Sequence, residues 1–452
     1  MSAAALPRPE GWLDHPEQPV AFGTDGSLLS RRQFTTDLNA SIARLRQLPG
    51  DAAILCTDSL YWFAVGLLSL AACRKHTIVA GSELPTNLMR LSDMARLVVS
   101  DREHPIPAAQ HRLEPGDRDT TPDWPDIDMA ASVSFFTSGS TSAPKRIDKQ
   151  LGHLIAEAEA ISKLFLAQQL DFRSTCGTVP HHHAYGLAFR LIWPLLAGLP
   201  FLDETPEFPE QALAQLDKGA VFVTSPAHLN RLDGLTLVSA ERQPACILSA
   251  GAPLGTEAAN QARSLLGCAV TEIYGSTETG ALACRYHDRL GEPWQPLPGV
   301  SLASAPSGQT EARAAHIPDG RAVLADSIRL RDNADGSFDL LGRTDRIVKI
   351  EAKRVSLDEV EARLRELEDV ADAVVIARGE PPRLAACVVP SPTGANFLAN
   401  QGAFRFNRRL RAGLALYLEA AGLPRHWRFI EQLPRGALGK ASQHDIETLF
   451  DE

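Results

Sequence analysis

Short apolar segments that alternate with helix-length segments are the feature that most constrains the fold of this chain. Up to Gly275 the strand-like runs are AAILC, HTIVAG, ARLVVS, SVSFF, TCGTVP, GAVFVTSP, ACILSAG and AVTEIYG. This alternation is typical of parallel sheets whose faces are covered by helices. At 452 residues the chain can bury a large core and hold more than one structural unit. We therefore predict an α/β fold class.

The pattern changes after about Leu341, where GRTDRIVKI leads into a charged helix and two strand-like runs, DAVVIAR and RLAACVV. Ser356 and Glu359 form a capping-box pair at the start of that helix. Apolar residues follow at helical spacing, namely Leu357, Val360, Leu364 and Leu367. We predict a large N-terminal domain of helix-covered sheets over residues 1–344 and a small, mobile α+β C-terminal domain over residues 345–452.

A later helix is expected from about Phe404 to Ala421. It would end at Gly422, because glycine commonly terminates helices and Pro424 cannot continue the helical hydrogen bonding. The segment HWRFIEQ and the loop LPRGALGK follow it.

Charge and cysteine content narrow the class of protein. The formal net charge of −10 argues against bulk binding to nucleic acid or to an anionic membrane, since both require a strongly basic face. The seven cysteines include no C-x-x-C pair, so we expect reduced thiols and neither a disulfide framework nor a zinc module. The most apolar stretch, Leu60 to Cys73, is too short for a membrane span. The N-terminus lacks a secretory signal, and the prediction is a cytoplasmic protein.

The first chemical motif is the segment TSGSTSAPK, which runs from Thr137 to Lys145 directly after SVSFF. Small residues let backbone N–H groups and hydroxyls surround phosphate oxygens, and a lysine supplies compensating charge. These residues indicate a nucleotide triphosphate, although such a run alone is also typical of a flexible loop. A Walker-type loop is disfavoured, because it needs glycine at Pro144 and serine or threonine at Arg146.

Together with later motifs, this loop resembles the superfamily of acyl-CoA synthetases, peptide-synthetase adenylation domains and luciferases. The motifs, in order, are TSGSTSAPK, PHHHAYGL, SAGAPL, YGSTET, LGR and LPRGALGK, spread over about residues 132 to 442. The resemblance implies an adenylate-forming enzyme that uses ATP and Mg²⁺ to convert a carboxylic acid into an acyl-adenylate. A thiol then accepts the acyl group, and AMP is released.

The resemblance also assigns roles to individual residues. The nucleotide is expected to contact Thr137, Ser138, Gly139, Ser140, Thr141, Lys145, Ala250, Gly251, Ala252, Tyr274, Gly275, Ser276, Thr277, Asp326 and Arg343. Within this set, the resemblance places the SAGAPL turn and Tyr274 beside adenine and Arg343 near Asp326. The acid pocket is expected to be lined by His183, Tyr185, Gly186, Ser225, Pro226, Ala250 and Gly275. The expected catalytic residues are Lys440, His183 and Glu278. Glu278 and Thr141 are the expected Mg²⁺ ligands, and Asp345 is the expected hinge.

Elementary chemistry agrees with several of these roles. A carboxylate such as Glu278, with triphosphate oxygens, suits Mg²⁺. A fixed ammonium such as that of Lys440 stabilises the charge that builds at phosphorus when a carboxylate attacks it. Asp326 is expected to accept both ribose hydroxyls, whereas Asp332 and Asp335 look like turn residues. Zinc at the three adjacent histidines is disfavoured, because consecutive side chains do not converge easily on one ion.

The substrate and acceptor stay open at this level. The pocket residues suit an aryl acid or a short-to-medium acyl acid. The acceptor is either coenzyme A or the phosphopantetheine arm of a free-standing acyl carrier protein. Ala352 stands where the resembled family commonly has a glycine for close backbone approach to such an arm. Two alternatives are a pseudoenzyme or scaffold that binds ATP or AMP without turnover, and a kinase-like enzyme that produces ADP.

Overall fold

The computed structural model describes residues 12–82, 84–106, 108–118, 122–137, 145–167, 172–287, 292–305, 309–333, 335–343, 346–350, 353–379, 381–434 and 443–450. The chain divides into two compact units. The first unit comprises Met1–Ser301 and Ala312–Ala322, and the second comprises Leu302–Glu311 and Val323–Glu452. The predicted domain boundary at residue 345, where the small domain is expected to hinge, stays a prediction.

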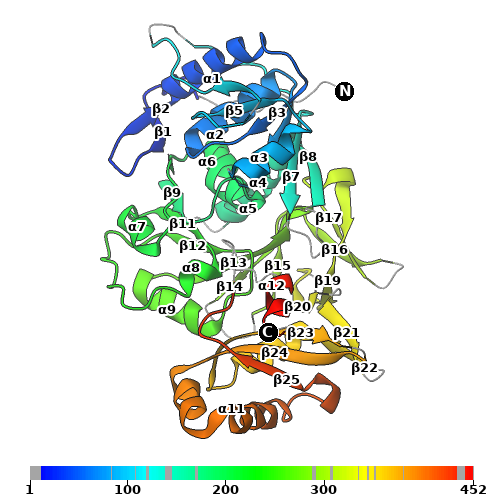
Figure 1. Cartoon of the computed structure of the whole chain (residues 1–452). Helices are drawn as coiled ribbons and strands as arrows, with labels where there is room; N and C mark the ends of the chain where they lie inside the picture. Colours follow the sequence, from blue (N-terminus) through cyan, green and yellow to red (C-terminus); the bar gives the residue numbers. More distant parts are fainter. Residues whose placement is uncertain are drawn as a thin grey trace. The chain divides into compact units, whose positions relative to one another are not determined.

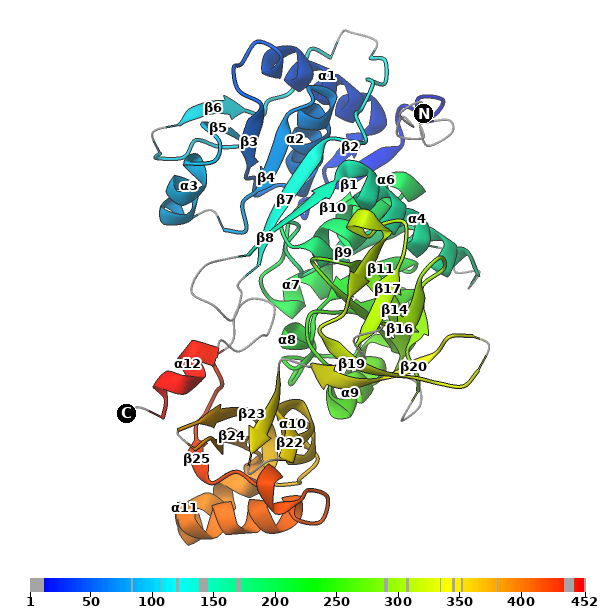
Figure 2. The ribbon, with the colours of Figure 1, turned by 90° about the vertical axis from the view of Figure 1, so that its right-hand side faces the viewer.

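One sheet of the first unit has the strand order β6-β5-β3-β4-β7-β8 over the described residues. Its strands are β3 (Ala52–Leu55), β4 (His76–Val79), β5 (Leu97–Ser100), β6 (Ala109–Arg112), β7 (Ser132–Thr137) and β8 (Lys145–Gln150). Neighbouring strands are parallel except for β7 and β8, which pair antiparallel and lie beside β4 in Figure 2. The associated helices are α1 (Arg31–Leu45), α2 (Leu60–Ala72) and α3 (Pro85–Ser92).

The other large sheet of this unit has the order β15-β14-β13-β12-β11-β9-β10-β1-β2 in the described part of the chain. Its strands are β1 (Pro19–Phe22), β2 (Leu28–Ser30), β9 (Ser174–Gly177), β10 (Phe201–Leu202), β11 (Ala220–Thr224), β12 (Cys246–Ser249), β13 (Val270–Ser276), β14 (Gly280–Tyr286) and β15 (Gln295–Pro296). Strands β9, β11, β12 and β13 are parallel neighbours, seen in succession in Figure 1. All eight strand-like runs of the sequence are therefore strands, and the α/β prediction is confirmed.

Helices accompany this second sheet between its strands. They are α4 (Leu151–Ala167), α5 (Ala184–Gly186), a π-helical segment (Leu187–Ile192), α6 (Trp193–Ala197), α7 (Pro209–Ala214), α8 (Pro226–Leu229) and α9 (Thr256–Leu266). Side chains of α7 and α9 pack on strand residues such as Phe222 and Ile247 to form a buried core. The apolar faces of these strands are thus covered by helices, as the alternating pattern requires.

The most apolar stretch of the sequence forms α2. The side chain of Ser59 caps its N-terminus by accepting a hydrogen bond from the backbone N–H of Trp62. Nearly every residue of α2 is buried, so its continuous apolar composition reflects a position inside the core. No helix in the described residues has the length and apolar character needed to cross a bilayer.

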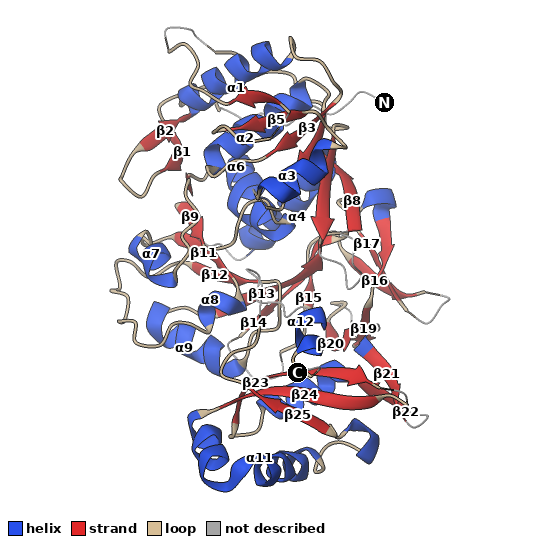
Figure 3. Ribbon diagram, viewed as in Figure 1, coloured by secondary structure: helices blue, strands red, loops and turns tan. Residues whose placement is uncertain are grey.

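The second unit consists of small sheets and three helices within the described residues. Its main sheet consists of β23 (Val370–Arg378), β24 (Arg383–Pro390) and β25 (His426–Phe429). One hairpin pairs β19 (Asp326–Leu330) with β20 (Phe338–Arg343), and another pairs β21 (Ile347–Ile350) with β22 (Lys353–Ser356). A further three-stranded sheet has β16 (Ser301–Ser304), β17 (Thr310–Arg313) and β18 (Arg321–Val323). Helices α10 (Leu357–Arg365) and α11 (Pro392–Leu414) cover one face of the main sheet, and α12 (Gln443–Thr448) covers the other (Figure 3).

The predicted helices of this unit are present, but both boundaries of the later one are wrong. The side chain of Ser356 accepts from the backbone N–H of Glu359 at 3.2 Å, which confirms the predicted start of α10. The later helix begins at Pro392 instead of Phe404 and ends at Leu414 instead of Ala421, and a separate 3-10 helix covers Ala420–Gly422. Gly402 has a φ of 76°, so two helical segments meet at a kink, and the sequence pattern indicated only the second.

Candidate active site

Four neighbouring parallel strands end at one edge of the nine-stranded sheet of the first unit. Ser225 and Pro226 follow β11 directly, Ala250 follows β12, and Tyr274 and Gly275 lie in the last part of β13. The histidine segment follows β9. Because the carboxyl ends of adjacent parallel strands share one edge of a sheet, the structure brings these separate motifs together.

An ion pair joins two motifs that are far apart in the sequence. Lys145, the first residue of β8, donates a hydrogen bond from Nζ to Oε1 of Glu278 at 2.9 Å. Partial burial alone would raise the pKa of Glu278, but the hydrogen bond and charge of Lys145 lower it below its ordinary value. Both side chains stay substantially exposed, at 63% and 40% respectively. The pair therefore offers an ionised carboxylate and an ammonium to a ligand. Residues 138–144 between β7 and β8, which include Ser138, Gly139, Ser140 and Thr141, lie outside the described residues.

The turn that carries Glu278 and Thr277 is held by reciprocal hydrogen bonds. The backbone N–H of Ser276 donates to Oγ1 of Thr279 at 3.1 Å, and the N–H of Thr279 donates to Oγ of Ser276 at 3.2 Å. Gly275 is required beside this turn, because a side-chain carbon there would collide with the carbonyl oxygen of Gly280. The sequence thus fixes the direction of the turn through small and hydroxyl residues.

A buried polar cluster lies behind the same turn. Oε1 of Glu157, on α4, accepts from the backbone N–H of Ala281 at 2.8 Å. Burial lowers the pKa of nearby Lys149, although the charges of Glu157 and Glu278 oppose that shift. His316 is also buried in this cluster, and burial lowers its pKa as well. Sequence reasoning did not find these residues, because each stands alone in its segment.

Glu272 on β13 forms the most connected buried carboxylate near the strand ends. Its Oε1 accepts from the backbone N–H of Leu254 at 2.9 Å. Its Oε2 accepts from Nε of Arg285 at 2.9 Å and lies 2.6 Å from Nε2 of His287. Burial alone would raise the pKa of Glu272, but His287 and Arg285 outweigh burial and lower it. Sequence reasoning missed Glu272, and the available signal was a carboxylate inside the apolar run AVTEIYG.

Aromatic rings extend this network toward Tyr274. The guanidinium carbon of Arg285 lies 4.7 Å from the ring centroid of Trp294. The rings of Trp294 and Tyr274 contact each other with centroids 5.7 Å apart. The aromatic residue that the sequence predicts beside adenine is therefore packed against a ring that a buried ion pair holds in place.

The histidine segment has a different character. His181 is buried against the ring of Phe63, and its Nε2 lies 3.0 Å from the carbonyl oxygen of Thr57. Burial lowers the pKa of His181 to about 3 and that of His182 to about 4. Both rings are therefore neutral at physiological pH. His183 is half-buried and precedes α5, with its ring 4.6 Å from that of His182.

Several buried polar atoms near these motifs have no hydrogen-bond partner within the described residues. They are Nδ1 of His181, the hydroxyl of Tyr185 and Oγ of Ser249. Ser249 ends β12 and directly precedes the predicted adenine turn. Gly186 is required here, because a side-chain carbon would collide with the carbonyl oxygen of Pro180. In proteins such unpaired buried groups call for an explanation, and a polar ligand is one.

In the second unit, Asp326 and Arg343 lie opposite each other across the antiparallel pair β19–β20. The predicted proximity of these two positions is thus present in the backbone register. Asp335 accepts from the backbone N–H of Ser337 at 2.9 Å, as expected for a turn residue. Asp345 and Lys440 lie outside the described residues.

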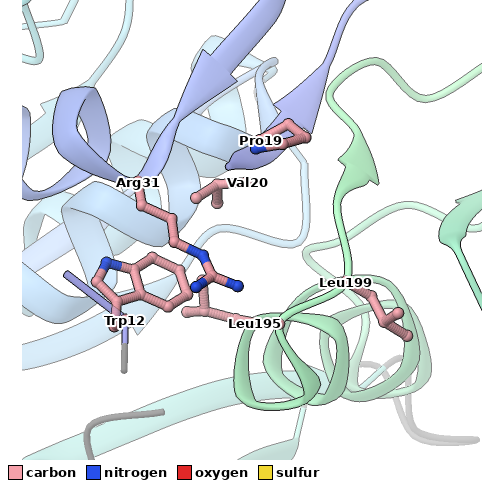
Figure 4. Close-up of a pocket in the computed structure, with 7 residues that line it drawn as sticks. Trp12, Pro19, Val20, Arg31, Leu195 and Leu199 are labelled. Carbon is pink, nitrogen blue, oxygen red and sulfur yellow. The ribbon is translucent and has the colours of Figure 1, made fainter. Parts of the chain in front are cut away.

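A pocket of the first unit, drawn in Figure 4, is separate from all these motifs. It is lined by Trp12, Pro19, Val20, Arg31, Leu195, Gly198 and Leu199. The guanidinium carbon of Arg31 lies 4.8 Å from the ring centroid of Trp12 and occupies the space between the flanking segments. This arginine acts as a packing element, and the pocket holds none of the predicted site residues.

Comparison with known proteins gives consistent matches. A family model described as AMP-binding enzyme matches residues 52–314, and one described as AMP-binding enzyme C-terminal domain matches residues 359–440. A 4-coumarate–CoA ligase of Rhodobacter capsulatus is 31% identical over 323 residues, which are 70% of this chain and 76% of that protein. A 4-coumarate–CoA ligase of Cereibacter sphaeroides is 29% identical over 316 residues, 69% and 70% of the two chains.

Solved structures share the fold. A benzoate CoA ligase from Burkholderia xenovorans LB400 superimposes with a TM-score of 0.76 at 18% identity, covering 96% of this chain and 97% of that chain. At this identity the likeness concerns the fold, which is mixed α/β along nearly the whole chain.

Proposed function

The chain belongs to the family of AMP-binding enzymes and is an AMP-forming acid–thiol ligase, and we propose that it activates an aryl carboxylic acid and transfers it to coenzyme A. The observation that carries this proposal is the Lys145–Glu278 ion pair. It joins the end of the TSGSTSAPK loop to the YGSTET turn, at strand ends where the histidine segment also lies. The similarity to two 4-coumarate–CoA ligases supports an aryl acid over a short or medium acyl acid.

Two chemical steps follow from this assignment. In the first, a carboxylate oxygen of the acid bonds to the α-phosphorus of ATP while the bond to pyrophosphate breaks. In the second, the thiol sulfur bonds to the acyl carbon, the mixed anhydride bond breaks and AMP leaves. We assign Lys145 to the neutralisation of phosphate charge and Lys440 to the charge that develops at the α-phosphorus.

The residues present fit a magnesium ion. Glu278 is half-buried, its pKa is lowered and it is therefore ionised at neutral pH, and Mg²⁺ commonly takes one or two protein carboxylates together with phosphate oxygens. We propose that Glu278, with Thr141, holds Mg²⁺ against the triphosphate. The ion neutralises phosphate charge as a Lewis acid.

The acid pocket is proposed at the strand ends described above. His183, Tyr185 and Gly186 would border it on one side, and Ser225, Pro226, Ala250 and Gly275 on the other. The neutral rings of His181 and His182, which precede His183 in the chain, add no charge to that side, which suits an aromatic ring better than a second charge. Asp326 and Arg343 are assigned to the ribose, and Asp345 to the hinge of the small domain.

Two further assignments concern the acceptor and the compartment. We favour coenzyme A because two of the relatives are 4-coumarate–CoA ligases, and a separate acyl carrier protein is the second candidate. All seven cysteines lie in the described part of the chain and are free thiols, as the sequence predicts. Free thiols are usual in a reducing compartment, which supports a cytoplasmic location.

The test is ATP–pyrophosphate exchange with a panel of aryl and fatty acids, comparing the native protein with Lys440→Ala. We expect exchange with aryl acids, strongly reduced in the variant. Thioester formation is then followed with coenzyme A and with a phosphopantetheinylated carrier protein. Nucleotide binding without exchange for any acid would favour a pseudoenzyme, and ADP as product would favour a kinase-like enzyme.

A further inference from the structure

Three chain segments meet at the carboxylate of Glu272. In the sheet, Glu272 pairs with Ser249 of β12 on one side and with Arg285 of β14 on the other. Ser249 begins the SAGAPL segment, and Leu254 ends it. Both ends of the SAGAPL turn are therefore held at Glu272. Strand pairing holds Ser249 at the start of the turn, and the hydrogen bond from the backbone N–H of Leu254 holds its end.

The two oxygens of this carboxylate have separate partners. Oε1 accepts from the backbone of the SAGAPL turn, whereas Oε2 accepts from Arg285 on β14 and from His287, the residue that follows β14. The Glu272 side chain is only 3% exposed, against 27% for Arg285 and 13% for His287. A buried ion pair contributes little net stability, because desolvation offsets the attraction. The main effect of this ion pair is therefore to hold its partners in place.

The network ends at the aromatic residue assigned to the nucleotide base. Arg285 lies over Trp294, and Trp294 contacts Tyr274. Tyr274 is itself two residues from Glu272 on the same strand, so both side chains are on the same face of β13. The SAGAPL turn and the Tyr274 ring are thus connected through one carboxylate.

We propose that Glu272 is a positioning residue for adenine recognition, which fixes the SAGAPL turn and Tyr274 at the spacing that the base requires. This inference rests on the proposed nucleotide site, in which we assign the SAGAPL turn and the Tyr274 ring to adenine. Glu272 does not touch substrate and acts through Leu254, Arg285 and Trp294. A small change in the distance between turn and ring weakens stacking and backbone contacts to the base together.

The test compares Glu272→Ala and Glu272→Gln with the native protein. The readouts are KM for ATP, KM for the acid, the selectivity for ATP over GTP, and the Kd of AMP from calorimetry. For Glu272→Ala we expect KM for ATP and Kd for AMP to rise about tenfold, the size of one lost charge-assisted hydrogen bond. KM for the acid should stay within about twofold, and selectivity against GTP should fall. Glu272→Gln keeps an acceptor for the N–H of Leu254, so its KM for ATP and its Kd for AMP should lie between those of Glu272→Ala and the native protein.

The matched control is Asp37→Ala. Asp37 is also a buried carboxylate. It accepts a hydrogen bond from the backbone N–H of Gly116 at 2.8 Å and forms an ion pair with Arg118 at 2.8 Å. It lies on α1, away from the strand ends. This variant should lose stability as Glu272→Ala does, yet keep its KM for ATP and its nucleotide selectivity.

The proposal is overturned if folded Glu272→Ala keeps native KM, Kd and selectivity, or if Asp37→Ala changes them equally. Should Glu272→Ala fail to fold, Arg285→Gln takes its place, because Arg285 is partly exposed, and an unchanged KM for ATP in that variant overturns the proposal. The Kd of AMP does not require turnover. Absence of exchange with every acid therefore counts against the proposed function, while the AMP arm still decides the role of Glu272.

Discussion

The two sides of the strand-end site differ in how their buried polar groups are satisfied. On the side of β13 and β14, Glu272 has partners on both carboxylate oxygens, and Ser276 and Thr279 bond each other. On the side of the histidine segment, Nδ1 of His181 and the hydroxyl of Tyr185 have none within the described residues. On the first side Oγ of Ser249 and Nε2 of His316 also lack a partner in the described residues, but the carboxylate and hydroxyl groups next to the YGSTET turn are paired, whereas on the second side the histidine and tyrosine groups are not.

This difference follows from the costs of burying polar atoms. A buried polar group without a partner costs about 1–3 kcal/mol, whereas a paired one adds rigidity. A site for a charged nucleotide gains from groups held in place before binding. Unpaired atoms on the other side are instead where a ligand atom would complete a hydrogen bond. We therefore expect substitutions on the first side to damage nucleotide chemistry, and those on the second to alter acid selection and acid stability.

The largest effect is expected for Glu278→Gln. Loss of the charge removes the proposed magnesium ligand and the partner of Lys145, and adenylation should fall about 100-fold or more, the size seen when one preorganised electrostatic group is removed. The measurement is kcat/KM in ATP–pyrophosphate exchange at several Mg²⁺ concentrations. KM for the acid should change little, because Glu278 is not among the residues of the proposed acid pocket.

Glu159→Gln is the control for this prediction. Glu159 is an exposed residue of α4, so the same change of charge there should leave exchange within about twofold. If Glu278→Gln keeps native activity, or if its defect lies in KM for the acid, the division between the two sides is wrong.

A second effect concerns pH. The pKa of His181 is about 3 in the folded protein, below its ordinary value, so the unfolded chain binds the extra proton as pH falls below about 6.5. This stability is present above about pH 6.5 and is lost at up to about 1.4 kcal/mol per pH unit as pH falls toward 3. The lowered pKa of Glu272 acts in the same direction, but only below its ordinary value of about 4.3. As pH falls, His181 should therefore lose its contribution to stability at a higher pH than Glu272 does.

Urea unfolding at about pH 7 and about pH 5 measures this difference. His181→Gln keeps a donor for the carbonyl of Thr57 but does not titrate, so its stability should depend less on pH over this range. Glu272→Gln should retain the native pH dependence there. If the stability of His181→Gln depends on pH as strongly as that of the native protein, the ring of His181 is not the group that takes up the proton.

The fold was predictable because its strands carry their own signal. Buried parallel strands read as short apolar runs, and each of the eight runs up to Gly275 is a strand. Several motifs also follow neighbouring parallel strands, and residues in such positions share an edge of the sheet. The roles of individual site residues stay predictions, and Lys440 and Ser138 to Thr141 lie outside the described residues.

What the sequence does not reveal is pairing between distant polar residues. Glu272 looks like a strand residue of the wrong polarity until Arg285 and His287 are found opposite it. The start of α11 was wrong for a related reason, because Gly402 interrupts the apolar pattern while the chain remains helical on both sides. In both cases a tertiary contact or a local kink overrides the pattern of the segment alone.

The smallest effect in stability is expected for Tyr185→Phe, with Tyr61→Phe as its counterpart. The hydroxyl of Tyr61 is buried and donates to Asp37 at 2.6 Å, so Tyr61→Phe leaves an acceptor without its partner and should cost about 1–3 kcal/mol. The hydroxyl of Tyr185 has no partner in the described residues, and its removal should be neutral or stabilise by up to about 1 kcal/mol.

The same substitution at these two positions separates the two sides of the site in activity as well. Tyr185→Phe should change the relative kcat/KM of hydroxylated and unsubstituted aryl acids, because the hydroxyl is free to bond a substituent of the acid, while KM for ATP stays native. Tyr61→Phe should leave the ranking of acids unchanged. A loss of stability in Tyr185→Phe equal to that in Tyr61→Phe would mean that its hydroxyl is already satisfied in the free protein, and the histidine side would then be as complete as the side that holds Glu272.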